Sequence, residues 1–176
     1  MELFYEGIIL RPWSVSDAEA LALIADNKNI ANNLRDGLPN PYGINDAIKW
    51  LNLILPENDP PRFFAIKYEE KLAGSIGIVT KTDIYRKNVE IGYFIGEEHW
   101  RKGIATKAIK AATSYSFSKF DIVRVYAEPF ADNSGSRRAL EKAGFKLEAT
   151  FKNYVIKNGI IKDSCIYSVL KENWQY

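Results

Sequence analysis

The 176-residue sequence contains one cysteine and one histidine, and these scarcities exclude several kinds of site. The single cysteine, Cys165, cannot form an internal disulfide. With His99 as the only histidine, neither a clustered zinc site nor a serine–histidine–aspartate triad is expected. We therefore expect no bound metal.

Long apolar runs and a strong charge are also lacking. No apolar run approaches the roughly 18 residues of a membrane-spanning helix. The first residues lack a basic start followed by an apolar stretch, so we expect no signal peptide. The formal net charge of +2 is too close to balance to indicate nucleic acid by itself. These absences predict a cytoplasmic protein whose partners include neither membrane nor nucleic acid.

What the sequence does contain is typical of an ordered globular protein. Hydrophobic residues make up 47% and aromatic residues 13% of the chain. A chain of this length corresponds to about one domain with a proper core. No repeat, linker or low-complexity segment is recognisable, so we expect a single domain over residues 1–176.

The order of apolar and turn-forming residues predicts an α/β (α+β) fold. Strands are predicted over residues 7–10, 63–68, 72–80, 89–95, 122–130, 145–156 and 161–170. Helices are predicted over residues 18–25, 29–33, about 45–55, 103–118 and from about 132 to 143. Pro129 lacks an amide donor, so regular pairing should fail near Glu128. The pattern predicts a mixed, mostly antiparallel sheet of about six to seven strands with flanking helices.

Residues 88–106 combine a strand, a loop of small residues and the first turn of a helix. Gly103 and Ala105 leave the start of the helix open, and Arg101 and Lys102 lie beside it. Unpaired amides, the positive end of the helix dipole and two cations suit a phosphate or pyrophosphate group. An ordinary glycine turn before a helix would leave the same pattern. The loop matches neither the Walker pattern nor G-x-G-x-x-G.

Four strings of residues, in order, resemble the GNAT superfamily of N-acetyltransferases, and most closely its branch of ribosomal-protein N-terminal acetyltransferases. They lie at residues 10–13, 32–42, 90–106 and 133–145. The resemblance covers nearly the whole chain and implies a single GNAT-like domain with a twisted sheet. It implies that the central strands holding Glu90 and Glu128 splay apart. Acetyl-CoA is then the co-substrate, and its pantetheine pairs with the backbone exposed between these strands.

The family's loop pattern is Gln or Arg, two residues, Gly, one residue, then Gly or Ala. Gly103 and Ala105 match it, whereas Trp100 stands at the Gln/Arg position, so backbone amides are the expected phosphate ligands. Asn133 matches the family's pantetheine-contacting asparagine, although a plain helix cap explains it equally well. The resemblance implies these cofactor-binding residues: Phe94, Ile95, Trp100, Arg101, Lys102, Gly103, Ile104, Ala105, Thr106, Asn133 and Arg138.

Acetyl transfer requires a neutral amine, so a base is expected near the cofactor strand. Deprotonation at pH 7 costs about 1 kcal/mol for an α-amino group and about 4.6 kcal/mol for a lysine. Glu90 is preferred because it shares a strand face with Gly92 and Phe94 on the segment that leads into the cofactor loop. The resemblance agrees, since a glutamate at the matching position is a base in several members of the family, whereas Glu128 matches the base of another branch. Ser136 matches the serine proposed to protonate the leaving thiolate. A salt-bridged glutamate and a helix-capping serine are the corresponding structural alternatives.

The acceptor is left open among peptide N-termini, polyamines, amino sugars and amino acids. Arg35, Tyr42, Tyr93 and Tyr154 are the expected acceptor-binding residues, although such aromatic residues are more often part of a core. The glutamate that the closest branch uses falls near Val155, which weakens any transfer of that branch's substrate. The expected activity is amine acetylation by direct attack in a ternary complex. The alternative to this activity is a non-catalytic acyl-CoA-binding regulator. A homodimer is a further expectation.

Overall fold

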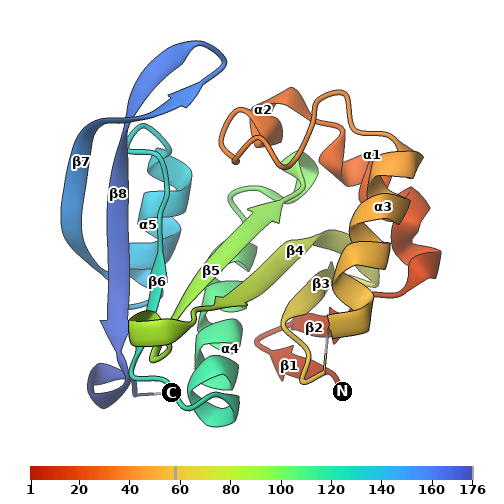
Figure 1. The fold of residues 1–176 in the computed structure, drawn as a ribbon. Helices are drawn as coiled ribbons and strands as arrows, with labels where there is room; N and C mark the ends of the chain where they lie inside the picture. Colours follow the sequence, from red (N-terminus) through yellow and green to blue (C-terminus); the bar gives the residue numbers. More distant parts are fainter. Residues whose placement is uncertain (58, 176) are drawn as a thin grey trace. The chain divides into compact units, whose positions relative to one another are not determined.

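The structure is a computed structural model that describes residues 1–57 and 59–175. It divides into two compact units (Figure 1). The first unit comprises Met1–Gly77 and Tyr93–Ile104, and the second comprises Ile78–Gly92 and Ala105–Tyr176. The prediction of a single domain therefore stays a prediction.

Strands of the first unit pair antiparallel in the order β1-β2-β3-β4. They are β1 (Leu3–Tyr5), β2 (Ile8–Pro12), β3 (Phe63–Tyr68) and β4 (Lys71–Thr80), the last of which ends in the second unit. The β3–β4 hairpin is confirmed. Strand β1 was not predicted, because three residues are too few to show an alternating pattern. It pairs with β2 across a turn in which Gly7 has a φ of +85°.

Helices of the first unit lie close to their predicted positions. They are α1 (Ala18–Ala25), α2 (Lys28–Ala31) and α3 (Ile44–Ile54), with 3-10 turns at Val15–Asp17, Leu55–Glu57 and Glu97–His99. The buried faces of α1 and α3 form a core cluster with Trp13, Tyr42 and Ala65. The rings of Trp13 and Trp50 meet edge to face with 5.5 Å between their centroids.

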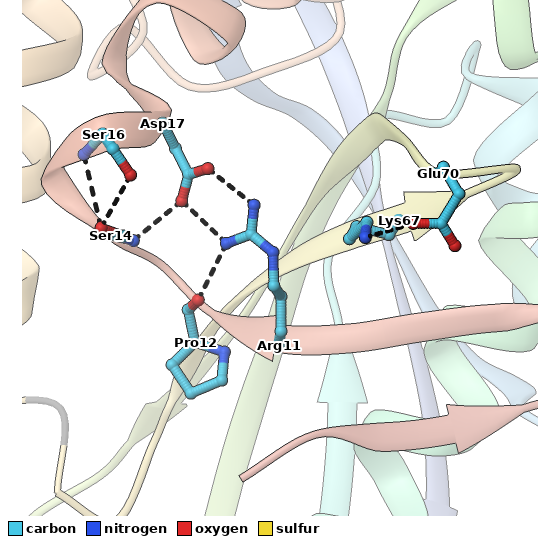
Figure 2. Close-up of polar contacts among 7 residues, drawn as sticks. All are labelled: Arg11, Pro12, Ser14, Ser16, Asp17, Lys67 and Glu70. Atoms are coloured by element: carbon cyan, nitrogen blue, oxygen red, sulfur yellow. Dashed lines mark hydrogen bonds and ion pairs between the residues drawn. The ribbon is translucent and has the colours of Figure 1, made fainter.

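A charged cluster ties the end of β2 to the start of α1 (Figure 2). Arg11 donates from both terminal nitrogens to the two carboxylate oxygens of Asp17, at 2.8 and 2.6 Å. Asp17 also accepts from the backbone N–H of Ser14 at 2.8 Å and completes a capping box with it. Burial alone would raise the pKa of Asp17, but the bonds from Arg11 and Ser14 lower it on balance.

Replacing Asp17 with asparagine should destabilise the protein by about 1–3 kcal/mol at pH 7, because hydrogen bonds to a charged group are lost. Urea unfolding measures this difference. Glu70→Gln is the control, since the Glu70 side chain is 85% exposed and its 3.0 Å ion pair with Lys67 (Figure 2) should contribute little to stability.

The effect of Asp17→Asn should also depend on pH. The folded-state pKa of Asp17 is lower than its unfolded value of about 3.9. Ionised Asp17 therefore contributes its full stabilisation at a pH above its unfolded-state pKa. That stabilisation is lost as the pH falls through the lower folded-state pKa. The stability difference between wild type and variant should be constant from about pH 7 to about pH 5 and should shrink below about pH 4. A difference that persists unchanged into strong acid would contradict this account.

Strands of the second unit follow the order β5-β6-β8-β7. They are β5 (Asn88–Ile95), which ends in the first unit, β6 (Arg124–Ala127), β7 (Lys146–Lys157) and β8 (Ile160–Leu170). The β5–β6 pair is parallel and the other two pairs are antiparallel. The described chain thus has eight strands instead of six to seven. The predicted hairpin turn is confirmed, with φ of 51° at Asn158 and 76° at Gly159.

Strand β6 is shorter than the predicted 122–130 because it ends before Pro129. The β5–β6 register joins Asn88 to Arg124, Val89 to Val125 and Glu90 to Tyr126, and within the described chain it extends no further. Past β6 the backbone stays beside β8, where Pro129 O accepts from Cys165 N at 2.9 Å. The expected failure of pairing near Glu128 is confirmed.

Helices α4 (Ile104–Lys119) and α5 (Ser134–Lys142) complete the second unit, with 3-10 turns at Asp83–Tyr85 and Lys171–Asn173. Gly144, with a φ of +95°, ends α5 as predicted. Among residues 1–57 and 59–175, no helix has the length and apolarity that crossing a membrane requires.

Candidate active site

The loop before α4 has an unusual backbone and an open surface. Arg101 and Gly103 both have positive φ angles, of 64° and 76°. A Cβ on Gly103 would meet nothing within 4 Å, so the space around this residue is open. Trp100 donates from Nε1 to Ile95 O at 2.7 Å, which fixes the indole at the end of β5. Fully buried Ile104 anchors the following helix. The loop at residues 101–103, directly before α4, is therefore exposed and suited to an anionic group.

Two other predicted cofactor residues contact partners that the sequence did not indicate. Lys102 Nζ lies 5.7 Å from the centroid of the Tyr68 ring on β3, within the range of a cation–π contact. Thr106 donates from its hydroxyl to Ala139 O at 3.5 Å, which connects the first turn of α4 to α5. Ala105 is half-buried and Arg138 is exposed.

Strand β5 approaches β4 closely because Gly74 has no side chain. A Cβ on Gly74 would lie 2.3 Å from the carbonyl oxygen of Phe94. Gly96 N donates to Ala73 O at 2.8 Å on the same edge. Gly74 therefore helps to position Phe94 and Ile95, two predicted cofactor residues, although no sequence motif includes Gly74.

Glu97 links the segment before the cofactor loop to helix α2. Asn27 donates from Nδ2 to one oxygen of Glu97 at 2.6 Å, and Asn29 donates to the other at 3.0 Å. Asn27 also caps α2 by accepting from Asn29 N at 2.8 Å. These partners are about 70 residues apart in sequence, so local pattern could not reveal them.

Replacing Gly103 with valine should weaken acetyl-CoA binding at least tenfold, about 1.4 kcal/mol. A branched side chain would strain a backbone with positive φ and would cover the start of α4. Calorimetric titration with coenzyme A measures the change.

The matched control is Gly159→Val in the β7–β8 turn. Gly159 has the same φ of 76° and the same open surroundings, so this variant carries the backbone strain without touching the cofactor loop. Its affinity for coenzyme A should equal that of wild type. An equal affinity in folded Gly103→Val would refute the phosphate-site interpretation.

Glu90 occupies the last pair of the β5–β6 register and is 8% exposed. Its Oε2 accepts from Lys81 Nζ at 2.7 Å and from the Tyr126 hydroxyl at 3.4 Å. Burial alone would lower the pKa of Lys81, but its bonds and charge contacts with Glu90 and Tyr126 raise it on balance. The sequence identified Glu90 and missed both partners. Glu90 is thus an ion-paired carboxylate at the point where the two strands part.

A pocket of about 580 Å³, which we name the Tyr126 pocket, opens beside this cluster in the second unit. Its polar lining includes Lys81, Arg124, Tyr126 and Glu148, and its apolar lining includes Phe151 and Ile166. Glu148 accepts hydrogen bonds from Arg124 and from the Ser168 hydroxyl. Burial would raise the pKa of Glu148, but these two bonds lower it on balance.

The second signature helix, α5, is capped by Asn133. The Asn133 side chain accepts from Ser136 N at 3.1 Å, so the capping interpretation of Asn133 is confirmed. Its contact with pantetheine stays a prediction. Ser136 is half-buried on the first turn of α5, and Glu128 accepts from the Ser164 hydroxyl at 3.0 Å.

Replacing Ser136 with alanine should lower kcat by about 10²-fold, the lower end of the range for general acid catalysis, while the KM for acetyl-CoA changes little. The backbone N–H that Asn133 caps remains in this variant, so thermal stability should stay near that of wild type. Ser134→Ala, on the same helical turn, is the control and should leave kcat unchanged. A loss of stability with normal kcat would show that Ser136 is structural.

The four predicted acceptor residues lie in different surroundings. Tyr42 is 6% exposed within the helical core of the first unit, where burial and the charge of Asp46 raise its pKa to about 12. Arg35 is exposed and Tyr93 is half-buried in the same unit. Tyr154 lies in the second unit with its ring 4.9 Å from that of Phe151. Their acceptor roles stay predictions.

Solved structures with the same fold define the class of protein. RimJ of Mycobacterium smegmatis, in complex with CoA-disulfide, superposes with a TM-score of 0.85 at 22% identity, covering 100% of this chain and 88% of RimJ. The microcin C7 self-immunity acetyltransferase MccE, in complex with acetyl-CoA and AMP, superposes with a TM-score of 0.80 at 26% identity. That superposition covers 94% of this chain and 93% of MccE. The fold is that of a coenzyme A-dependent acetyltransferase, as predicted.

Sequence comparison identifies the family. The sequence-family model of the acetyltransferase (GNAT) domain matches residues 8–146 of this chain. The uncharacterized N-acetyltransferase YoaA of Bacillus subtilis is 33% identical over 94% of this chain and 94% of its own length. The chain belongs to the GNAT family of acetyl-CoA-dependent N-acetyltransferases, with a RimJ/RimL-like fold.

Two relatives from Escherichia coli differ in their acceptors. The ribosomal-protein-serine acetyltransferase is 26% identical over 66% of this chain and 65% of its own length. The spermidine N(1)-acetyltransferase is 26% identical over 60% of this chain and 58% of its own length. One name specifies a protein and the other a polyamine, so similarity to these relatives does not define the acceptor.

Proposed function

We propose that the protein acetylates a primary amine, either a protein N-terminus or a small molecule, by direct attack of the amine on acetyl-CoA in a ternary complex. The observation that carries this proposal is the Glu90 carboxylate. It is buried at the last β5–β6 pair and oriented by Lys81 and Tyr126. The names of the two E. coli relatives specify a ribosomal protein for one and the small molecule spermidine for the other.

The exposed loop directly before α4 suits the phosphates of acetyl-CoA. Backbone N–H groups at a helix start, a positive dipole end and the nearby Arg101 and Lys102 are all favourable to an anion. Gly103 keeps the approach open. Thr106 connects this helix start to α5, which carries Asn133 and Ser136.

In the proposed reaction the nitrogen lone pair of the acceptor attacks the thioester carbonyl. The new C–N bond forms, the C–S bond breaks and the thiolate leaves. The proton released by the amine goes to Glu90, directly or through water. Ser136 supplies a proton to the thiolate and regains one from solvent, while Glu90 gives its proton to solvent, so both side chains return to their starting forms. An α-amino group needs only about 1 kcal/mol to become neutral at pH 7, against about 4.6 kcal/mol for a lysine. A carboxylate acting through water is adequate for the first.

Replacing Glu90 with glutamine should lower the plateau of kcat/KM by about 10²–10⁴-fold, the usual range for general base catalysis. In wild type kcat/KM should rise with pH and level off as the amine becomes neutral. Steady-state kinetics over a pH series, following thiol release, measure both effects. Coenzyme A affinity should not change, because the helix start does not involve this side chain.

The matched variant is Glu128→Gln, which should lower the plateau of kcat/KM much less than Glu90→Gln does. A larger loss in Glu128→Gln than in Glu90→Gln would assign the base to Glu128. If neither change slows turnover, catalysis rests on positioning of two substrates, and a low-pKa amine is the acceptor. A screen of peptide N-termini, polyamines, amino sugars and amino acids tests the activity itself. Binding of coenzyme A without thiol release in any of the four would contradict the proposal.

A further inference from the structure

The Tyr126 pocket holds two cations in fixed positions around one aromatic ring. The guanidinium carbon of Arg124 lies 5.1 Å from the centroid of the Tyr126 ring, and Lys81 Nζ lies 5.5 Å from it. Both distances are within the range of cation–π contacts. Arg124 is also held by Glu148, which in turn is held by Ser168. These contacts preorganise both cations before a ligand binds.

Each cation retains the capacity to bind an oxyanion. A guanidinium has five N–H donors in a planar fork, and the bond to Glu148 uses one of them. An ammonium has three donors, and that of Lys81 is hydrogen-bonded to Glu90 and Tyr126, which leaves capacity for one more acceptor. The side chains of Arg124 and Lys81 are 22% and 28% exposed, so an ion bound there is only partly screened by water.

The ion pairs of this cluster leave its net charge near zero. Lys81 and Arg124 are balanced by Glu90 and Glu148, so charge alone selects neither a polyamine nor an anion, and the N–H donors that remain on the two cations carry the selection. Phe151 and Ile166 give the pocket an apolar wall. The volume of about 580 Å³ is within the range of small-molecule sites. These properties suit a small compound with one oxyanion and an apolar part.

The pocket adjoins the carboxylate at which the amine is expected to react. Tyr126 lines the pocket and donates to Glu90, and Lys81 contacts both. We infer that the Tyr126 pocket is an acceptor subsite that binds the carboxylate of a small amino compound, with Arg124 as its main ligand. The inference rests on the proposed function, because it requires that the amine of the same molecule react near Glu90.

Matched pairs of acceptors test this inference on the unaltered protein. Leucine and leucinamide share an amine and an apolar side chain and differ in the carboxylate. Glucosamine 6-phosphate and glucosamine provide the same comparison for a phosphate. We expect kcat/KM, calculated from the concentration of neutral amine, to be at least tenfold higher for leucine than for leucinamide. A preference found only in the glucosamine pair would overturn the carboxylate and assign a phosphate instead.

The variant Arg124→Gln tests whether the pocket is the source of the preference. Its kcat/KM should fall at least tenfold more for leucine than for leucinamide, and this ratio is unaffected by partial unfolding. Arg86→Gln is the matched control. Arg86 is exposed, follows the 3-10 turn Asp83–Tyr85, of which Tyr85 lines the pocket, and donates to the carbonyl of Asp83. The ratio in Arg86→Gln should equal that of wild type.

The outcomes separate this inference from the proposed function. Turnover of leucinamide and leucine at equal rates would refute the carboxylate subsite and leave amine acetylation intact. A preference for leucine that survives in Arg124→Gln would place recognition outside the Tyr126 pocket and also refute the inference. Absence of turnover with all amines, despite coenzyme A binding, would refute the proposed function itself.

Discussion

The parting of β5 and β6 is the constraint on which the candidate active site depends. The two strands pair in parallel only as far as Glu90 and Tyr126. Past that point Pro129 can accept a hydrogen bond from β8 but has no N–H with which to continue a ladder. The chain after β6 therefore follows β8, as the Phe130–Ser164 bridge also shows. Glu90 consequently lies at the end of the ladder instead of within a continuous sheet face.

Features that depend on one or two neighbouring residues could be predicted from the sequence. Pro129 predicted the end of the pairing, Asn158-Gly159 predicted the hairpin turn, and Gly144 predicted the end of α5. Each acts through its own backbone preference, which the rest of the fold does not change. Strand β1 could not be predicted, because its three residues depend on pairing with β2 for their structure.

The hydrogen-bond partners of the site residues could not be predicted from the sequence, for a different reason. Glu90 was identified from its place on a strand, but Tyr126, which donates to it, lies 36 residues further along the chain. The resemblance to the GNAT family identified candidate site residues, but it did not identify the side chains that orient them. It also could not separate capping from pantetheine binding, because an asparagine at position 133 is suited to either role. Only the geometry assigned the cap to Asn133 instead of Ser136.

The ion pair that orients Glu90 also limits how the carboxylate can act. Lys81 and Glu90 together are neutral, and a partly buried charge is costly when its partner is lost. If Glu90 takes the proton of the acceptor amine, the Lys81 ammonium loses its balancing charge while its contact with Tyr126 remains. The candidate base is therefore the Lys81–Glu90 ion pair as a unit and not an isolated carboxylate.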